Sequence, residues 1–558
     1  LLSLLLLMQP GAVAPATVFV SHAWRYTFAE VIEALLEFAA KQPKPVFFWF
    51  DLFLNNQHGT AKRPQSWWTE RFRRSIAQVG TVLLVLSPYS NPIPLTRAWC
   101  LWEIFSALET PGVELLLWLS GRQTQSFREA LVQNSGAVIS TLVAVDAENA
   151  EAFLPQDRDM IFAAIAANPG GFHRLNAVVK DQLRDWLLAH CAALADEVAQ
   201  EPPSIEVGAQ IYSVGQVFAQ FGMSDRAVTY LTRARDIYQQ YRRELLAIES
   251  TADEDRDVAD TNLVICLLGL AGALGQDMMA ERRQLLRQAE ELLADKTGDT
   301  PDLQRAQIYM QLTYQAHKDG DYPQVLALSE KALAIMQRVY GDGSPSTAQL
   351  LMNMGVASHE MGDFAGALDS MQQCEAIQAS RKDPELAFTL DNLAWSNYEL
   401  GRLVEAEQAV IRGLQVRREI YGDNHPDLAF SHVTLGQVLV AQGRHAEALE
   451  HVSDLDRHTD DFGRGYCLDV RGQALAGLGR FDEAETALQR AIAIRREAGK
   501  RDEVGRSYAH LAAARAAAGH AAAAREAARL AFEFFDKLPP THPHRTDPAL
   551  LALAAAEI

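Results

Sequence analysis

Cysteine is scarce in this chain of 558 residues, and the few cysteines follow no ligand or disulfide pattern. There are five, an odd number, and no two of them have the CxxC spacing of a zinc site or a redox motif. Each lies within an apolar helical pattern: Cys100, Cys191, Cys266, Cys374 and Cys467. The scatter argues against a metal site and a disulfide framework, and it predicts a reducing, cytoplasmic environment.

Long apolar runs and phosphate-binding glycine motifs are also lacking. The leucine-rich start, LLSLLLL, is too short to span a bilayer, so we expect no membrane partner. We interpret residues 1–15 as an N-terminal extension; the alternative is the end of a secretory signal. Because the chain contains neither GxGxxG nor GxxxxGK[ST], we expect no bound nucleotide cofactor of the Rossmann or P-loop kind.

Positive charge is the third deficit, since the formal net charge is −20. Residues 1–195 hold 15 Lys and Arg against 16 Asp and Glu, which leaves 36 against 55 for the rest of the chain. An acidic C-terminal two-thirds does not provide the clustered cations that a nucleic acid requires, so no nucleic-acid partner is expected. Its charge favours basic or amphipathic peptide partners.

The first third of the chain alternates strand and helix patterns. Apolar runs that predict strands follow one another at 17–24, 44–51, 81–89, 113–119 and 140–146. Helical spacing lies between them at 28–40, at 66–79 with Ser66 as a candidate N-cap, and at 97–108. This series predicts an α/β doubly wound parallel sheet of five strands, whose ligands bind beyond the carboxyl ends of the strands.

Polar and aromatic residues follow the first three predicted strands. They are Ser21, His22 and Trp24 after the first, Asp51 and Asn55 after the second, and Ser87 and Tyr89 after the third. Glu103 lies on the helix after the third strand, one turn beyond Trp99 and off the apolar stripe of that helix. Taken alone, this position is typical of a helix-surface glutamate.

The blocks VFVSHAW, FAEVIEAL, PVFFWFD, VLLVLSPYS and RAWCLWEI resemble a TIR domain in their order and spacing. The resemblance covers about residues 16–190, including connector helices at the end, and thins after residue 120. Some TIR domains cleave the nicotinamide–ribose bond of NAD, and others are scaffolds that self-associate. The resemblance implies a catalytic role for Glu103 with NAD as substrate, and a site lined by Ser21, His22, Trp24, Asp51, Asn55 and Trp99.

A single carboxylate suits this chemistry. Departure of nicotinamide leaves an oxocarbenium-like ribose that a nearby carboxylate stabilises, and the neutral leaving group needs no general acid. Ala23 stands where the family often carries an arginine, which weakens the enzymatic interpretation. Asp51 as a strand-end cap and Trp24 and Trp99 as core residues stay open as alternatives. The resemblance also implies self-association, with the loop at 52–65 touching the next protomer.

Residues 205–545, after the proline-rich EPPS at 201–204, repeat themselves. The blocks NLAWSNYELGRLVEAE, TLGQVLVAQGRHAEAL and VRGQALAGLGRFDEAE share one glycine with three further copies. Its copies are 36 to 42 residues apart: Gly320, Gly362, Gly401, Gly443, Gly479 and Gly519. A glycine that ends the first helix of a pair at this period is typical of tetratricopeptide repeats. We expect an all-α solenoid of about eight helix pairs, with residues 546–558 as a capping helix.

The repeats resemble the kinesin-light-chain variety, because REIYGDNHPDLAF carries its GDxHP linker. Such arrays bind proteins or peptides on a concave face. The two halves together predict a cytoplasmic TIR-domain signalling protein that cleaves NAD to nicotinamide and ADP-ribose or its cyclic form. Its repeat array would regulate or recruit it. The alternative is a non-enzymatic interaction scaffold.

Overall fold

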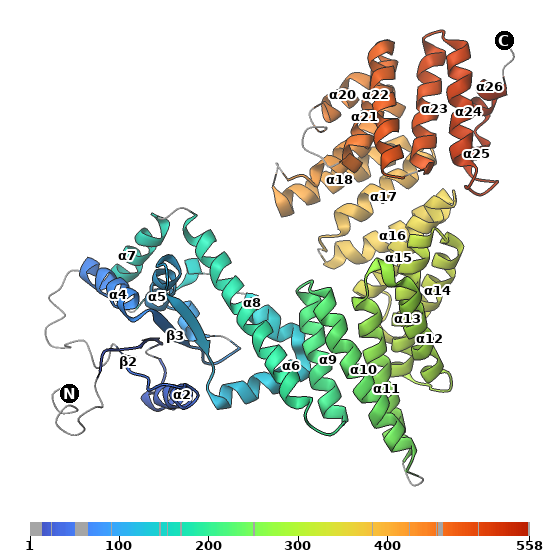
Figure 1. The fold of residues 1–558 in the computed structure, drawn as a ribbon. Coiled ribbons are helices and arrows are strands. Elements are labelled where there is room, and N and C mark those ends of the chain that lie inside the picture. The colour runs from blue at the N-terminus through green and yellow to red at the C-terminus, as the bar shows by residue number, and fades with distance from the viewer. Residues whose placement is uncertain are drawn as a thin grey trace. The chain divides into compact units, whose positions relative to one another are not determined.

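A computed structural model describes residues 14–23, 25–50, 65–90, 92–143, 147–152, 155–167, 170–248, 252–381, 383–422, 425–453, 455, 461–499 and 501–555. The chain divides into two compact units, 1–288 and 289–558. Figure 1 shows a small sheet with flanking helices in the first unit and helices alone in the second.

The sheet of the first unit has four described strands in the order β2-β1-β3-β4, and every neighbouring pair is parallel. The strands are β1 (Val18–Ser21), β2 (Phe48–Trp49), β3 (Thr81–Val85) and β4 (Glu114–Trp118). Val18 and Val20 pack against α2 (Phe28–Ala40), whereas Phe19 between them packs against α4 (Gln65–Val79). Because successive side chains of a strand point to opposite faces, helices cover both faces of the sheet, as predicted.

Three details of the α/β prediction are wrong. Residues 140–143 end helix α6 (Gly121–Val143) instead of starting a fifth strand, and 144–146 lie outside the described residues. A short apolar run fits a buried helix as well as a buried strand, which explains the error. The edge strand β2 is shorter than the predicted 44–51, and α4 begins at Gln65, so Ser66 is not its N-cap.

Further helices complete the first unit around the sheet. They are η2 (Ile93–Thr96), α5 (Ala98–Glu109), η3 (Ala147–Asn149), α7 (Pro155–Ala166) and α8 (Gly171–Val198). The proline-rich stretch 201–204 connects α8 to α9, and α9 packs on both α6 and α8. The first helix of the repeat region therefore belongs to the same compact unit as the sheet.

The described helices after residue 204 follow one another as eight pairs. The pairs are α9/α10 (Ile205–Gln220, Ser224–Leu246), α11/α12 (Asp253–Ala273, Met279–Leu293), α13/α14 (Asp299–Asp319, Tyr322–Tyr340), α15/α16 (Pro345–Glu360, Phe364–Arg381), α17/α18 (Leu386–Glu399, Leu403–Tyr421), α19/α20 (Leu428–Ala441, His445–Val452), α21/α22 (Asp461–Gly477, Phe481–Glu497) and α23/α24 (Arg501–Ala517, Ala521–Phe535). Two short helices, α25 (Pro543–Thr546) and α26 (Pro548–Ala555), follow them.

The shared glycines end the first helices as predicted. All six have φ between 71° and 83°, which an L-residue with a side chain rarely adopts. Small residues let the helices of a pair approach closely: a Cβ on Gly472 would lie 2.5 Å from Leu488. At the end of the array, α26 packs on α24 and α23, and Leu550 is buried in their core.

Candidate functional site

The predicted NAD site contains one buried polar pair. The Ser21 hydroxyl at the end of β1 donates a 2.6 Å hydrogen bond to a carboxylate oxygen of Glu103 on α5. Ser21 is fully buried, and Glu103 is only 8% exposed. The surface interpretation of Glu103 is therefore wrong, because α5 turns this side chain into the protein beside β1.

The other predicted residues are only partly brought together. His22 is partly buried and packs on Phe50, with the ring centres 4.6 Å apart. The Trp99 ring lies 5.6 Å from that of Phe72, and its indole N–H donates to Asp157 on α7 at 3.1 Å. These contacts agree with the core interpretation of Trp99. Trp24, Asp51 and Asn55 lie outside the described residues, as does the predicted contact loop apart from Gln65.

A second candidate site lies in the repeat region. A cavity of about 340 Å³ opens between the first helices of the last four pairs, α17, α19, α21 and α23. Nine of its nineteen lining residues stand 13, 10, 6 or 3 positions before the shared glycine: Trp395, Tyr398, Val433, Gln437, Tyr466, Asp469, Arg506, Ala509 and Ala513. This spacing places them on one face of each first helix. The glycine frame was visible in the sequence, so counting back from it could have identified these residues.

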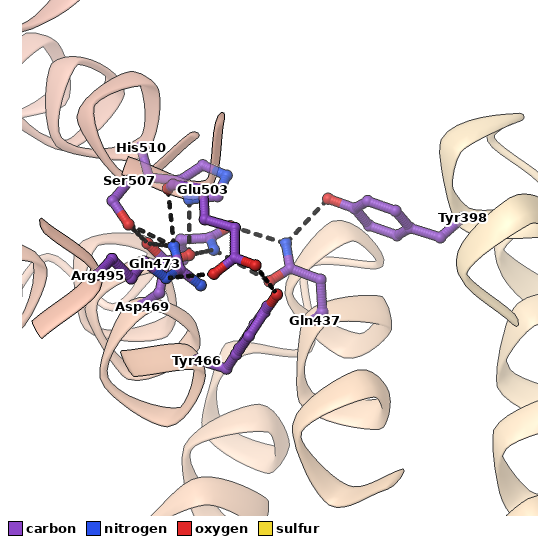
Figure 2. A network of polar contacts seen from close by, with 9 residues as sticks. All are labelled: Tyr398, Gln437, Tyr466, Asp469, Gln473, Arg495, Glu503, Ser507 and His510. Carbon is purple, nitrogen blue, oxygen red and sulfur yellow. Dashed lines mark hydrogen bonds and ion pairs between the residues drawn. The ribbon is translucent and has the colours of Figure 1, made fainter. Parts of the chain in front are cut away.

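A polar network connects the walls of this cavity, as Figure 2 shows. The Gln437 amide donates to the Tyr398 hydroxyl at 2.9 Å and to Gln473 at 3.1 Å. Gln473 in turn donates to the Asp469 carboxylate at 3.0 Å. The network therefore runs from α17 through α19 to α21, which are the first helices of three successive pairs.

Asp469 is the centre of the charged part of the network. Its carboxylate accepts 2.7 Å and 2.8 Å hydrogen bonds from Ser507 and His510 of α23, and Arg495 of α22 lies 3.2 Å away. Burial by itself would raise the pKa of Asp469, but His510 and Arg495 hold it well below its usual range. The carboxylate therefore stays ionised, and His510 presents a partly exposed ring to the cavity.

Tyr466 and Glu503 extend the charged cluster on the other side. The Tyr466 hydroxyl donates to Glu503 at 2.6 Å, and the Arg495 guanidinium lies over the Tyr466 ring at 4.6 Å. Burial raises the pKa of Tyr466 above its usual value, so its hydroxyl remains a donor. The cavity thus combines aromatic faces with a fixed set of paired charges.

The described residues contain neither a metal-binding cluster nor a helix that could span a membrane. No three His, Cys, Asp or Glu side chains come together in a way that could hold a metal ion. No helix in that part of the chain is both long and apolar enough to cross a membrane.

Comparisons with known families identify the repeats. Two family models, both described as tetratricopeptide repeat, match residues 304–380 and 381–454, and residues 465–498. These segments are tetratricopeptide repeats, which confirms the prediction for this part of the chain. The resemblance of residues 16–190 to a TIR domain stays a prediction. A search of curated proteins finds no match.

Several solved structures are similar to this chain. A putative kinesin light chain with nearly identical TPR-like repeats from Podosopora anserina is 20% identical, covers 35% of this chain and 97% of its own, and has a TM-score of 0.30. The apo form of RapI is 13% identical, with 65% and 96% covered and a TM-score of 0.49. A Rap protein complexed with competence and sporulation factor is 12% identical, with 63% and 98% covered and a TM-score of 0.37. All three TM-scores lie below 0.5, so these likenesses say nothing about function.

Proposed function

We propose that this chain is a protein-interaction scaffold whose repeat array binds a partner peptide in the cavity between α17 and α23. The observation that carries this proposal is the lining: Trp395, Tyr398 and Tyr466 lie beside paired charges, and four successive repeats contribute. Aromatic side chains bury much area and are enriched among the residues that dominate binding energy. The hydrogen-bond network holds the polar groups in place before binding, which lowers the cost of ordering them.

The charges of the cavity indicate the chemistry of the peptide. Glu399, Asp469, Arg506 and His510 line the same space as the aromatic residues. The Arg506 guanidinium lies 5.8 Å from the centre of the Trp395 ring, so a stacked cation already borders the site. An amphipathic peptide with an apolar or aromatic anchor and flanking charges fits this lining. The acidic balance of the array favours a basic flank.

A peptide-display selection against the full chain tests this proposal. An enriched peptide is titrated against wild type and Tyr398→Ala, which removes an aromatic wall of the cavity. We expect about a tenfold or greater loss of affinity. Tyr340→Ala is the matched control, because Tyr340 ends α14, is 59% exposed and does not line the cavity. Equal loss in both variants, or none in either, would contradict binding in this cavity.

NAD cleavage by the α/β part is the second candidate function, and the burial of Glu103 beside Ser21 favours it. A carboxylate shielded from water interacts more strongly with a developing positive charge than one on the surface does. In this proposal NAD is the substrate, no cofactor is needed and Glu103 stabilises the oxocarbenium-like ribose. The α/β parts of several chains associate in the cytoplasm through the 52–65 loop, and the array controls that association.

Nicotinamide release from NAD by the purified full chain, with and without a crowding agent, tests this second function. Glu103→Gln keeps an acceptor for the Ser21 hydroxyl but removes the charge, so we expect at least a hundredfold lower rate. Glu109→Gln on the same helix is the control, since Glu109 pairs with Arg174 instead. If wild type releases no nicotinamide even when assembled, the scaffold function remains alone.

A further inference from the structure

The chain after α24 does not continue the repeat pattern. It turns back and reaches the junction of α15 and α16, which is 180 residues earlier in the sequence. A Cβ built on Gly362 at that junction would lie 2.6 Å from Pro543 Cδ and 2.9 Å from His542 Cδ2. Only a glycine allows the two segments to approach so closely, so the segment after the last pair is in direct contact with the fourth pair.

Two histidines, His542 and His544, connect this segment to its neighbours. The rings of His542 and His544 lie 6.1 Å and 6.4 Å from the ring of Phe364, the first residue of α16. His544 also has a ring nitrogen 3.8 Å from Glu399 at the end of α17. On the opposite side its ring stacks on Phe535 of α24 at 5.8 Å. His544 therefore bridges α24 to α16 and α17.

The same segment forms part of the cavity wall. His544, Asp547, Ala549, Leu550 and Leu553 line the cavity together with the first helices of the last four pairs. Its turns are held locally: Arg545 donates to the backbone oxygens of Asp536 and Leu538 at 3.0 Å and 2.8 Å. Asp547 accepts from the backbone of Ala549 at 2.8 Å. The segment is thus one wall of the cavity, with turns that its own hydrogen bonds hold in place.

We propose that residues 538–555 form a latch, an intramolecular segment that closes one side of the cavity between α17 and α23 and that a partner peptide must displace to bind there. This inference rests on the proposed peptide-binding function, because it concerns the regulation of the same cavity. The contacts between the latch and α15–α17 are aromatic and histidine contacts around a glycine, and burial lowers the pKa of His544, so its 3.8 Å contact with Glu399 is not an ion pair. Contacts of this kind are weak enough individually for exchange with a competing peptide.

Hydrogen exchange of the full chain tests whether the latch is docked on the fourth pair. The Arg545 and Thr546 amides donate to the His542 oxygen at 2.9 Å and 3.1 Å, so they report on the latch. Phe364→Ala removes the ring that contacts both histidines, and we expect at least fivefold faster exchange of these two amides. Phe430→Ala on α19 is the control, because Phe430 is exposed and does not line the cavity.

The reciprocal variant guards against simple unfolding of the fourth pair. His544→Ala lies in the latch, and we expect it to speed exchange of the Gly362 and Asp363 amides, which donate to His359 and Ser358 at 2.9 Å each. Coupling in both directions supports the docked latch. Unchanged exchange at the α15–α16 junction in His544→Ala would overturn it, whatever Phe364→Ala does to the stability of its own helix.

A binding experiment then tests displacement. A labelled synthetic peptide of residues 538–555 is titrated against full-length wild type and full-length His542→Ala/Pro543→Gly. We expect at least tenfold tighter binding to the double variant, since its own latch is no longer held against the fourth pair and no longer closes that side of the cavity. Equal affinity for both proteins would overturn the latch.

A display-selected peptide whose binding depends on Tyr398 but is equal for both proteins would overturn the latch while leaving the proposed function intact. Tighter binding of the 538–555 peptide without any Tyr398-dependent partner peptide would support the latch and overturn the proposed function.

Discussion

Two buried aspartates stand at the same place in different repeats, ten residues before the shared glycine, but they have different neighbours. Asp391 on α17 is paired with Arg417, and the Ser431 hydroxyl donates to its oxygens at 3.0 Å and 3.1 Å. Asp469 on α21 has Arg495 and Ser507 in the equivalent positions, and His510 as well. In the earlier cluster, Thr434 stands at the position that matches His510. Its hydroxyl donates to the backbone oxygen of Phe430 instead of to the aspartate.

Burial raises the pKa of both carboxyls, but the net shifts have opposite signs. Burial raises the pKa of Asp391 to about 6, against the opposing effect of Arg417. At Asp469 the effects of His510 and Arg495 outweigh burial, so its pKa is lowered. One aspartate–arginine–serine set therefore joins adjacent repeats inside the core, whereas the other set, which includes a histidine, forms part of a cavity wall. The comparison teaches that the same buried set can have different surroundings in different repeats of one array.

Replacing each aspartate by asparagine should give the largest difference in stability between the two clusters. Asp469→Asn leaves Arg495 and His510 without their shared carboxylate, so we expect a loss of about 3 to 5 kcal/mol in local stability. Asp391→Asn also leaves a buried arginine, Arg417, unpaired, but it removes a carboxylate whose ionised form burial already disfavours, so its cost should be smaller than that of Asp469→Asn. Hydrogen exchange of α21–α23 and of α17–α19 in the full chain measures both. Equal costs would show that the clusters do not differ.

The pH dependence of the same helices should have opposite signs. The folded pKa of Asp391 lies above its unfolded value of about 3.8, so α17–α19 should gain stability as the pH falls from about 6 towards 3.8, by at most about 3 kcal/mol in total. The folded pKa of Asp469 is lowered, so its contribution is present above about 3.8 and is lost only below that pH. Hydrogen-exchange rates of α17–α19 and α21–α23, corrected for the intrinsic effect of pH on exchange, test both predictions. The gain for α17–α19 should vanish in Asp391→Asn.

The smallest effect is expected from exchanging the residue that distinguishes the clusters. His510→Thr places in the Asp469 cluster the threonine that stands at the matching position, Thr434, in the Asp391 cluster. It removes the hydrogen bond between His510 and Asp469, at a cost of about 1 kcal/mol. Because the pKa of Asp469 then rises, the acid-induced loss of α21–α23 should begin at a higher pH than in wild type. Thr434→Ser at the matching position serves as the control and should leave that onset unchanged. An onset unmoved by His510→Thr would mean that Arg495 alone holds the carboxylate ionised.

Local signals account for what could be predicted about the fold. The shared glycines end helices because only a glycine tolerates the left-handed backbone there, and that requirement is written in single positions. Helix α2 follows its apolar spacing from Phe28 to Ala40, with Thr27 and Glu30 forming a capping box. The strand predicted at 140–146 was wrong because a short apolar run fits the spacing of a helix as well as that of a strand.

The sequence by itself determined the order of the elements, the parallel sheet with helices on both faces, and the repeat frame. Each of these follows from periodicity or from a residue with one special backbone conformation. The tertiary structure alone decided that Glu103 is buried against Ser21, 82 residues away, and that Trp99 meets Asp157. It also decided that the latch returns to Gly362. Such contacts depend on how whole helices pack, and no short stretch of sequence carries a signal for a partner so distant along the chain.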